Sequence, residues 1–294
     1  MKGDERAGVL LWRRLKRNKA AVAALVVLAV IVFFAVFADL IAPYNRGIQQ
    51  NSAIRLQSPS REHLLGTDDY GRDVFTRIIH GGRLSLSLGV SATVLAMAAA
   101  FVLGSIAGYF GGLPDEIIMR IMDTLLCIPY MLLSLAIVAA LGPGLRNLMI
   151  AMVVSYIPNF TRIIRSIVLT IVENEYIEAA RACGSGSFKI IYRHVLRNAL
   201  GPIIVQAAMS VAGMILLAAA LSFIGLGVNP PAPEWGAMLS EAREFLRRAP
   251  HLMVFPGLAI LLTALSLNLV GDGLRTRLMC GLIGEVGRLC FFQI

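Results

Sequence analysis

The stretch that decides the fold is Leu84–Phe110, which reads LSLSLGVSATVLAMAAAFVLGSIAGYF and contains no charged residue. A helix needs about 20 apolar residues to cross the ~30 Å hydrocarbon core of a bilayer, so this run is long enough to span a membrane. Of the 294 residues, 57% are hydrophobic and only 15% are charged, with a mean hydropathy of +0.74. Soluble domains usually carry about 25% charged residues. The sequence therefore predicts an all-α integral membrane protein.

Five further runs are apolar enough to cross a bilayer. The first is a retained span rather than a cleaved signal peptide, because its uncharged run Ala20–Ala38 exceeds the roughly 7–15 apolar residues of a cleaved signal. The fourth is short, and Pro158 interrupts it. The six predicted transmembrane helices are about Ala20–Ala42, Leu84–Phe110, Ile117–Leu141, Leu145–Ile164, Ile203–Ile224 and Leu252–Val270.

The net charge of +9 is explained by the loops between these helices. Cytoplasmic segments of membrane proteins are enriched in Lys and Arg, and with an inner N-terminus the inner segments hold the larger share of them. We therefore expect both termini to be cytoplasmic, together with the loop of residues 165–200. No basic patch is interleaved with aromatic side chains for base stacking, so the expected partner is the lipid bilayer and not nucleic acid.

The motifs of enzymes are missing from the sequence. It contains no G-x-x-x-x-G-K-[ST], no G-x-S-x-G and no H-E-x-x-H. Cys127, Cys183, Cys280 and Cys290 form no C-x-x-C pair, so we expect neither a catalytic residue nor a metal site. Asp123 is the clearest ionisable residue within a predicted span. It is expected near the cytoplasmic end of its helix, at the membrane interface or in a hydrogen bond between helices, which leaves a membrane-embedded enzyme or channel as a remote alternative.

Two other patterns predict how elements pack. Gly104, Gly108 and Gly112 are spaced four apart, which lets two helix backbones approach closely. The stretch Trp235–Leu246 has apolar residues at helical spacing, with charged residues such as Glu241 on the other face. This second pattern predicts a short helix on the outer side. It would either lie at the membrane surface or present a docking surface to an external partner, and both interpretations remain open.

The loop of residues 165–200 is longer than topology requires. It predicts a helix at Glu173–Cys183, a break at Gly184–Gly186 and a second helix at Ser187–Arg197. Either an amphipathic segment on anionic lipid or a docking element for a soluble partner would have this pattern. The second helix is expected to place Phe188, Ile191 and Val195 on one side and Lys189, Arg193 and Arg197 on another.

The sequence of this loop resembles the EAA loop of ABC importer permeases. The resemblance rests on Glu178, Ala179 and Ala180, followed by Gly184 and by the segment Ile190–Leu196. It implies that the loop couples the protein to an ATPase subunit, with Glu178, Ala179, Ala180, Arg181 and Gly184 as the coupling residues. It also implies the type I permease fold. No cofactor is expected for this chain, because ATP would be bound by partner subunits.

Further segments resemble the second, C-type permease subunit of the dipeptide, oligopeptide and nickel class. The resemblance implies a sibling permease, two ATP-binding subunits and an extracytoplasmic solute-binding protein in a prokaryotic cytoplasmic (inner) membrane. Peptides are the expected substrate, with nickel or another small solute as the alternative, and the substrate-binding residues are unknown. The segments are Arg13–Lys19, His63–Asp68, Gly71–Val74, Gly82–Ser85, Leu221–Gly227, Phe255–Gly257 and Asn268–Arg275.

The expected domains are residues 1–83, with the first helix and an outer loop, and residues 84–275, the five-helix permease core. Residues 276–294 form a tail that departs from the family pattern. A second departure is Arg197, where the family usually has proline. Without that proline, we expect the helix of the loop to run more continuously into the fifth span.

Overall fold

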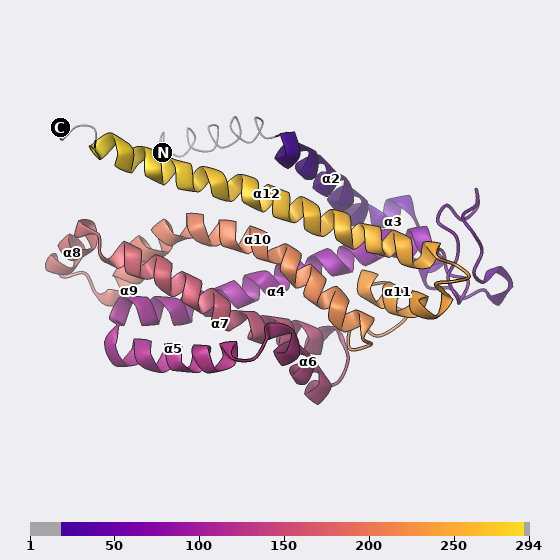
Figure 1. Ribbon diagram of the computed structural model, residues 1–294, viewed down its shortest axis with the longest axis horizontal. Coiled ribbons are helices and arrows are strands. Elements are labelled where there is room, and N and C mark those ends of the chain that lie inside the picture. Colours follow the sequence, from indigo (N-terminus) through magenta and orange to yellow (C-terminus); the bar gives the residue numbers. More distant parts are fainter. Residues whose placement is uncertain (1–18, 291–294) are drawn as a thin grey trace.

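The computed structural model describes residues 19–290, with side chains from residue 19 to residue 273. This part of the chain is almost entirely helical and has no β-strand, only an isolated bridge between Thr67 and Asp73. Figure 1 shows long helices lying roughly along one axis, with α8 and α9 at one end of the molecule and α11 at the other. We refer to these as the α8 end and the α11 end.

The helices account for all six predicted spans, with changed boundaries. The α-helices are α2 (Lys19–Val36), α3 (Ala38–Ile41), α4 (Val74–Phe110), α5 (Gly112–Leu126), α6 (Tyr130–Leu141), α7 (Leu145–Val172), α8 (Glu175–Ala182), α9 (Ser187–Ile190), α10 (Leu196–Phe223), α11 (Trp235–Ala242) and α12 (His251–Cys290). The 3-10 turns η1, η2 and η4 cover Tyr44–Gly47, Ser52–Ile54 and Arg243–Phe245, and η3 (Ile191–Val195) is a π-helical turn. The predicted tail continues the backbone of α12 as far as Cys290, and its side chains lie outside the described residues, as does most of the basic run Arg13–Lys19.

The second span begins earlier than its uncharged run. Helix α4 starts at Val74, because the side chain of Asp73 accepts a hydrogen bond from the backbone N–H of Thr76 at 2.9 Å and caps the helix. The apolar run set the predicted start at Leu84 and missed this cap. The first turns of α4 therefore belong to the α11 end of the molecule, where Val74 packs in the same cluster as Trp235.

The prediction of one continuous third helix is wrong. Helices α5 and α6 are bent by 85° at the break between Leu126 and Tyr130. Pro129 lies in this break, and a proline cannot donate the backbone hydrogen bond that would continue the helix. Among the residues that the structure describes, five helices are long and apolar enough to cross a membrane, or six if the bent pair counts as one span.

The predicted interruption of the fourth span at Pro158 is also wrong. Helix α7 runs without a break from Leu145 to Val172 with Pro158 inside it. The residue is buried, and neighbouring helices can accommodate a proline within a membrane helix.

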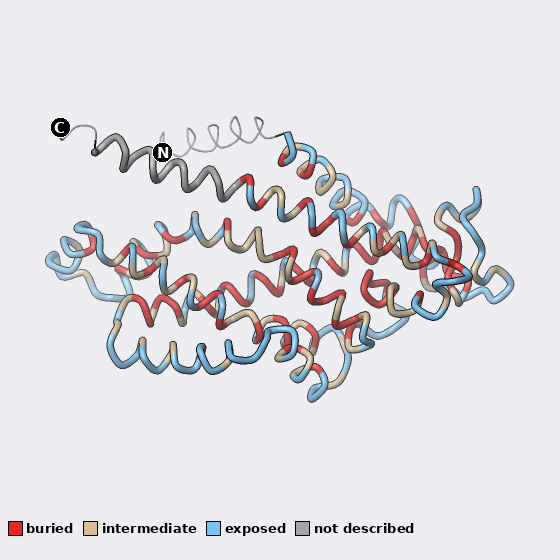
Figure 2. The backbone as a smooth tube through the Cα atoms, viewed as in Figure 1, coloured by how far each residue is buried: buried red, intermediate tan, exposed pale blue. Residues whose placement is uncertain are grey.

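The core lies between α4, α7 and α10, where buried residues concentrate (Figure 2). A Cβ atom on Gly104 would lie 3.0 Å from the backbone nitrogen of Arg165, and one on Gly108 would lie 3.0 Å from the Cβ of Val168. These two glycines therefore let α4 and α7 approach closely, as predicted. Gly112 does not belong to this contact, because it lies beyond the end of α4 with no atom within 4 Å of its Cβ position.

Helix α11 forms where the sequence predicted a short outer helix, and much of its apolar face packs against the rest of the chain. Its apolar residues Trp235, Met238 and Ala242 are buried within this chain, in a cluster that also contains residues of α4 and α12. The Trp235 indole N–H donates to the carbonyl oxygen of Ile78 at 2.9 Å. The buried Glu234 carboxylate caps the helix by accepting from two backbone N–H groups. These three apolar residues are thus part of the fold and are available neither to lipid nor to an external partner.

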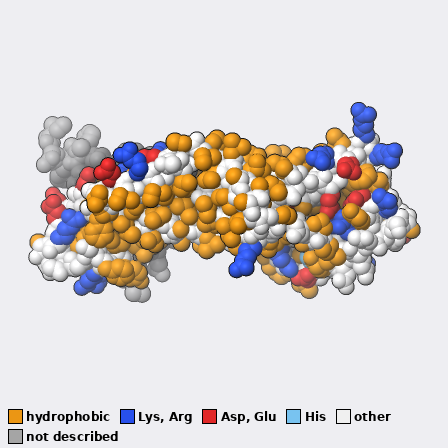
Figure 3. Space-filling view, turned by 90° about the horizontal axis from the view of Figure 1, so that it is seen from below, with side chains coloured by type: hydrophobic (Ala, Val, Ile, Leu, Met, Phe, Trp, Pro, Cys, Tyr) orange, Lys and Arg blue, Asp and Glu red, His pale blue; other side chains and the backbone are white. Residues whose placement is uncertain are grey.

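The distribution of apolar and charged side chains on the surface of the bundle matches the layers of a bilayer. Figure 3 shows hydrophobic side chains over most of the middle of one face, with Lys, Arg, Asp and Glu gathered mainly toward the two ends. This distribution is the one expected of a protein that crosses a hydrocarbon layer.

Candidate coupling loop and outer charge cluster

The segment that resembles the EAA loop forms a compact element at the α8 end. Helix α8, a turn and helix α9 connect α7 to the continuous helix that ends at Phe223 (Figure 1). Asn174 closes the end of α7, because its side-chain amide donates to the carbonyl oxygens of Thr170 and Ile171 at 2.9 and 3.0 Å. The structure thus confirms the predicted order of this loop, which is a first helix (α8), a break and a second helix that begins with α9.

Buried side chains pack this element against the helix bundle. Ile177 of α8, Ile190 of α9 and Val195 of the π-helical turn are each 0% exposed and belong to the same core cluster as α4 and α7. Because packed cores transmit displacement rather than absorb it, a force on α8 would reach α4 and α7. The sequence interpretation missed Ile177 and Ile190, whereas it placed Val195 on the apolar side of the second helix. The sequence pattern that could have identified the two isoleucines is an apolar side chain within an otherwise polar helix.

The residues of the predicted motif lie mostly on the surface of this element. Glu178, Ala179, Arg181 and Gly184 are exposed, and Ala180 is half-buried against the core. Arg181 also has a contact within the chain, since its guanidinium lies 5.0 Å from the ring centroid of Tyr109 in α4. The structure therefore brings the five residues together on one short helix and its terminal turn.

Gly184 determines how α8 ends. Its φ of +74° lies in the left-handed region, which disfavours side chains with a Cβ. The N–H of Gly184 donates to the carbonyl oxygen of Arg181 at 2.9 Å, and the N–H of Ser185 donates to that of Ala180 at 3.1 Å. These two bonds form a Schellman motif. The requirement for glycine is thus conformational, because no atom of the described residues lies within 4 Å of its Cβ position.

The second helix of the loop differs from its predicted pattern. The π-helical turn at Ile191–Val195 changes the helical phase, so the predicted apolar side is buried only at Val195, while Phe188 is 83% exposed. The helix continues unbroken from Ser187 to Phe223, as predicted, although it contains Pro202. Phe188 and Tyr192 also border an apolar groove of about 310 Å³ against α4.

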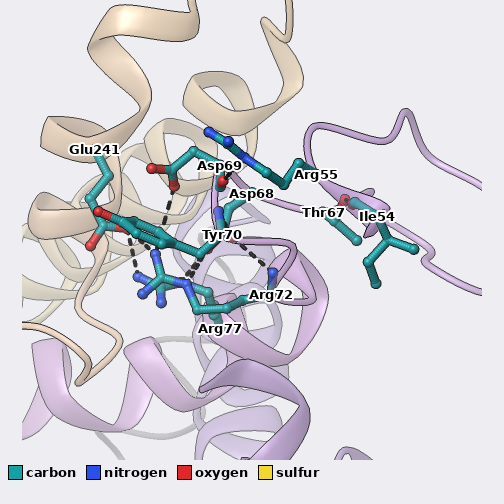
Figure 4. Close-up of polar contacts among 9 residues, drawn as sticks. All are labelled: Ile54, Arg55, Thr67, Asp68, Asp69, Tyr70, Arg72, Arg77 and Glu241. Carbon is teal, nitrogen blue, oxygen red and sulfur yellow. Dashed lines mark hydrogen bonds and ion pairs between the residues drawn. The ribbon is translucent and has the colours of Figure 1, made fainter. Parts of the chain in front are cut away.

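At the α11 end, a cluster of charged side chains joins two distant segments of the chain (Figure 4). Arg72 and Arg77 are each 1% exposed. The Nη2 atoms of both arginines donate to Oε2 of Glu241, at 2.7 and 2.9 Å, and Nε of Arg72 donates to Oδ2 of Asp68 at 2.6 Å. We call Asp68, Asp69, Arg72, Arg77 and Glu241 the outer charge cluster.

The outer charge cluster perturbs the ionisation of Asp69. Burial, with the neighbouring charges of Asp68 and Glu241, raises the pKa of Asp69 from 3.8 to about 6, and Arg72 only partly opposes this shift. The sequence interpretation did not identify the cluster. It placed Glu241 on a solvent-facing side of a surface helix, whereas Glu241 is half-buried against α4.

Asp123 makes the hydrogen bond between helices that the sequence allowed for. Nη2 of Arg162 in α7 donates to Oδ1 of Asp123 at 2.5 Å. Asp123 lies near the C-terminal end of α5, one turn before the break after Leu126, whereas the sequence interpretation placed it near the start of its helix.

Comparison with known proteins agrees with this architecture. Residues 100–279 match the family model described as binding-protein-dependent transport system inner membrane component. Residues 8–59 match the N-terminal transmembrane domain of oligopeptide transport permease C.

Three relatives align over almost their whole length. The dipeptide transport system permease protein DppC of Alkalihalophilus pseudofirmus is 46% identical, over 94% of this chain and 91% of the relative. The di/tripeptide transport system permease protein DppC of Pseudomonas aeruginosa is 43% identical, over 91% and 90%. The glutathione transport system permease protein GsiD of Pectobacterium atrosepticum is 42% identical, over 91% and 89%. With at least five apolar helices long enough to span a membrane among its described residues and a family match over most of its length, the chain belongs to the family of binding-protein-dependent transport system inner membrane components.

Proposed function

We propose that this protein is the C-type permease subunit of an ATP-driven importer of dipeptides and short oligopeptides. The observation that carries the proposal is the full-length similarity to permeases named for dipeptide, di/tripeptide and glutathione transport. Glutathione is itself a tripeptide. These names favour a peptide over nickel as the transported solute.

The complete importer would contain a sibling permease, two ATP-binding subunits and a solute-binding protein. The family description supports the last of these, because it names binding-protein-dependent transport. In this arrangement the protein is not itself an enzyme, and the ATP-binding subunits bind and hydrolyse ATP. The assembly would lie in a prokaryotic cytoplasmic membrane, with both termini and the α8 end in the cytoplasm.

The loop at the α8 end would receive the motion of the ATPase. Its exposed motif residues Glu178, Ala179, Arg181 and Gly184, with the half-buried Ala180, would contact an ATP-binding subunit. The exposed aromatic side chains of Phe188 and Tyr192, on the helix that follows the turn, would add apolar contact area. Since Ile177 and Ile190 are packed into the core, closure of the ATPase pair would shift α4 and α7 and alternate the access of the pathway.

The test is import by the complete system. The chain is expressed with its neighbouring ATPase, permease and binding-protein genes in a bacterial strain that lacks its own peptide permeases and requires an amino acid. Growth on a dipeptide that contains this amino acid is expected, and a strain without this chain should not grow. Uptake of nickel with no uptake of dipeptides would contradict the proposal.

A further inference from the structure

The exposed faces of the long helices differ in polarity. On α2, α4 and the described part of α12 most of the large exposed side chains are apolar and suit contact with lipid; examples are Val26, Phe33, Val94, Val102 and Leu261. The exposed residues in the second half of α7 are all polar: Asn159, Arg162, Ser166 and Thr170. Their spacing of three or four places them on one side of the helix.

A matching polar stripe runs along α5. Glu116, Arg120, Asp123 and Thr124, with Cys127 just after the helix, are exposed, and together with Met119 they line a hollow of about 420 Å³. The two stripes meet where Arg162 donates to Asp123, and these side chains are 57% and 54% exposed. We call the exposed polar residues of α5 and α7 the polar strip.

The polar strip lies at a depth where lipid would be an unfavourable neighbour. At about 1.5 Å per residue, Arg162 lies roughly 25 Å from the start of α7 at Leu145 and roughly 15 Å from its end at Val172. Ionisable side chains within membrane-spanning segments face the interior of a helix bundle or a water-filled cavity. The polar strip is open in this chain, so water or a partner must cover it.

The helix break next to the strip favours water and solute. Asp123 lies one turn before the break, since the backbone N–H of Cys127 donates to its carbonyl oxygen at 3.1 Å. Beyond the break, α6 starts at Tyr130 without a side-chain cap, so its first N–H groups remain available to an anion. Broken membrane helices are tolerated where they line a cavity, and they form substrate sites in other transporters.

We propose that the polar strip lines the aqueous pathway of the importer, and that Arg162 and Asp123 transiently bind the carboxylate and ammonium ends of a peptide in transit. The proposal rests on the proposed function as a peptide permease. Arg162 would pair with the peptide carboxylate, and Asp123 would pair with its ammonium group. Because the two side chains pair with each other when the pathway is empty, binding exchanges one ion pair for others and stays weak enough for release.

The first experiment measures the access of water in the complete importer in proteoliposomes. Cys127 is an exposed thiol at the end of the strip and serves as the reporter after Cys183→Ser, Cys280→Ser and Cys290→Ser. The matched control carries Val26→Cys on the apolar face of α2 together with Cys127→Ser. A membrane-impermeant maleimide should label Cys127 more than about tenfold faster than the control, because thiolates form and react in water.

The second experiment measures uptake of radiolabelled dialanine per assembled complex. The double variant Asp123→Asn/Arg162→Gln keeps hydrogen-bonding groups and removes both charges. Its uptake should fall about tenfold, the effect of one charge-assisted hydrogen bond. The control Asp115→Asn/Arg165→Gln removes the other ion pair between α5 and α7, at 2.5 Å, whose side chains are less exposed. Its uptake per complex should stay at the wild-type level.

The outcomes separate the two proposals. Labelling of Cys127 no faster than that of the α2 control, or wild-type uptake by the Asp123/Arg162 double variant, would overturn the assignment of the polar strip. A wild-type complex that imports no dialanine would overturn the proposed function and the peptide site. The labelling rates would then still decide whether the strip faces water.

Discussion

Arg72 and Glu241 are separated by 169 positions in the sequence, yet Nη2 of Arg72 lies 2.7 Å from Oε2 of Glu241. This ion pair joins the segment before α4 to helix α11. Because Arg77 donates to the same oxygen, one carboxylate holds two buried guanidinium groups. The α11 end of the molecule is therefore stabilised by buried ion pairs as well as by the burial of Trp235.

We predict that Glu241→Gln destabilises the α11 end of the molecule. The change leaves two buried arginines without their shared carboxylate and should lower the free energy of unfolding by on the order of 2 kcal/mol. Thermal unfolding of the purified protein in lipid nanodiscs measures the loss. Glu244→Gln is the matched control, since Glu244 is exposed and near the same helix. Equal melting temperatures for both variants would contradict the role given to Glu241.

Stability should also depend on pH through Asp69. Because its pKa is raised from 3.8 to about 6, the folded protein keeps a proton between these values that the unfolded chain has released. The contribution of Asp69 to stability is therefore greatest below pH 3.8, falls as pH rises to about 6, and stays constant above. Asp69→Asn should raise the melting temperature at neutral pH and reduce its change between about pH 5 and about pH 7. A lower melting temperature at neutral pH would speak against this ionisation.

The turn after α8 should tolerate Asn but not Val at Gly184. A β-branched residue at φ +74° costs about 1–2 kcal/mol of local strain and should open the turn, whereas Asn adopts this conformation more readily. Gly184→Val is expected to reduce dialanine uptake and stimulated ATP hydrolysis with normal membrane insertion, and Gly184→Asn should retain both activities. Gly186→Val is a second control, because Gly186 has an ordinary φ of −64° and no atom near its Cβ position. Wild-type uptake by Gly184→Val would exclude a conformational requirement for glycine.

Reversing the charge of Glu178 should weaken the contact between the permease and the ATPase. Glu178 is exposed on α8, so Glu178→Lys leaves the core intact and changes only the surface offered to the ATPase. Stimulated ATP hydrolysis and uptake should both fall about tenfold, as expected for loss of a charged contact at an interface. Glu173→Lys, at an exposed position just before the loop element, should have little effect. Equal activities of these two variants would show that Glu178 has no specific contact with the ATPase.

Most of the helices could be predicted from the sequence, because a helix that crosses a bilayer requires a long apolar run. The runs Leu84–Phe110 and Leu252–Val270 meet this requirement. The errors fall where a local signal competes with packing. Pro158 was expected to break α7 and is accommodated by neighbouring helices, whereas Pro129, within a run expected to be one helix, marks the 85° bend. Two prolines of the same chemistry therefore had opposite effects.

The candidate site was only partly predictable for a similar reason. The motif Glu178, Ala179, Ala180 and Gly184 is contiguous, so its position and its turn follow from local sequence. The buried anchors Ile177 and Ile190 and the pair between Asp123 and Arg162 depend on which helix faces are covered. That information is absent from any single segment.

The sequence by itself determined that this chain crosses a membrane repeatedly and ends α8 in a glycine turn, because hydrophobic length and the left-handed conformation of Gly184 are local properties. Only the tertiary structure decided that Glu241 joins Arg72 and Arg77, that α11 packs inward, and that the polar residues of α5 and α7 form one strip. These relationships depend on the relative placement of helices far apart in the chain, and that placement is set by the close approach of α4 and α7 and by the burial of side chains between them.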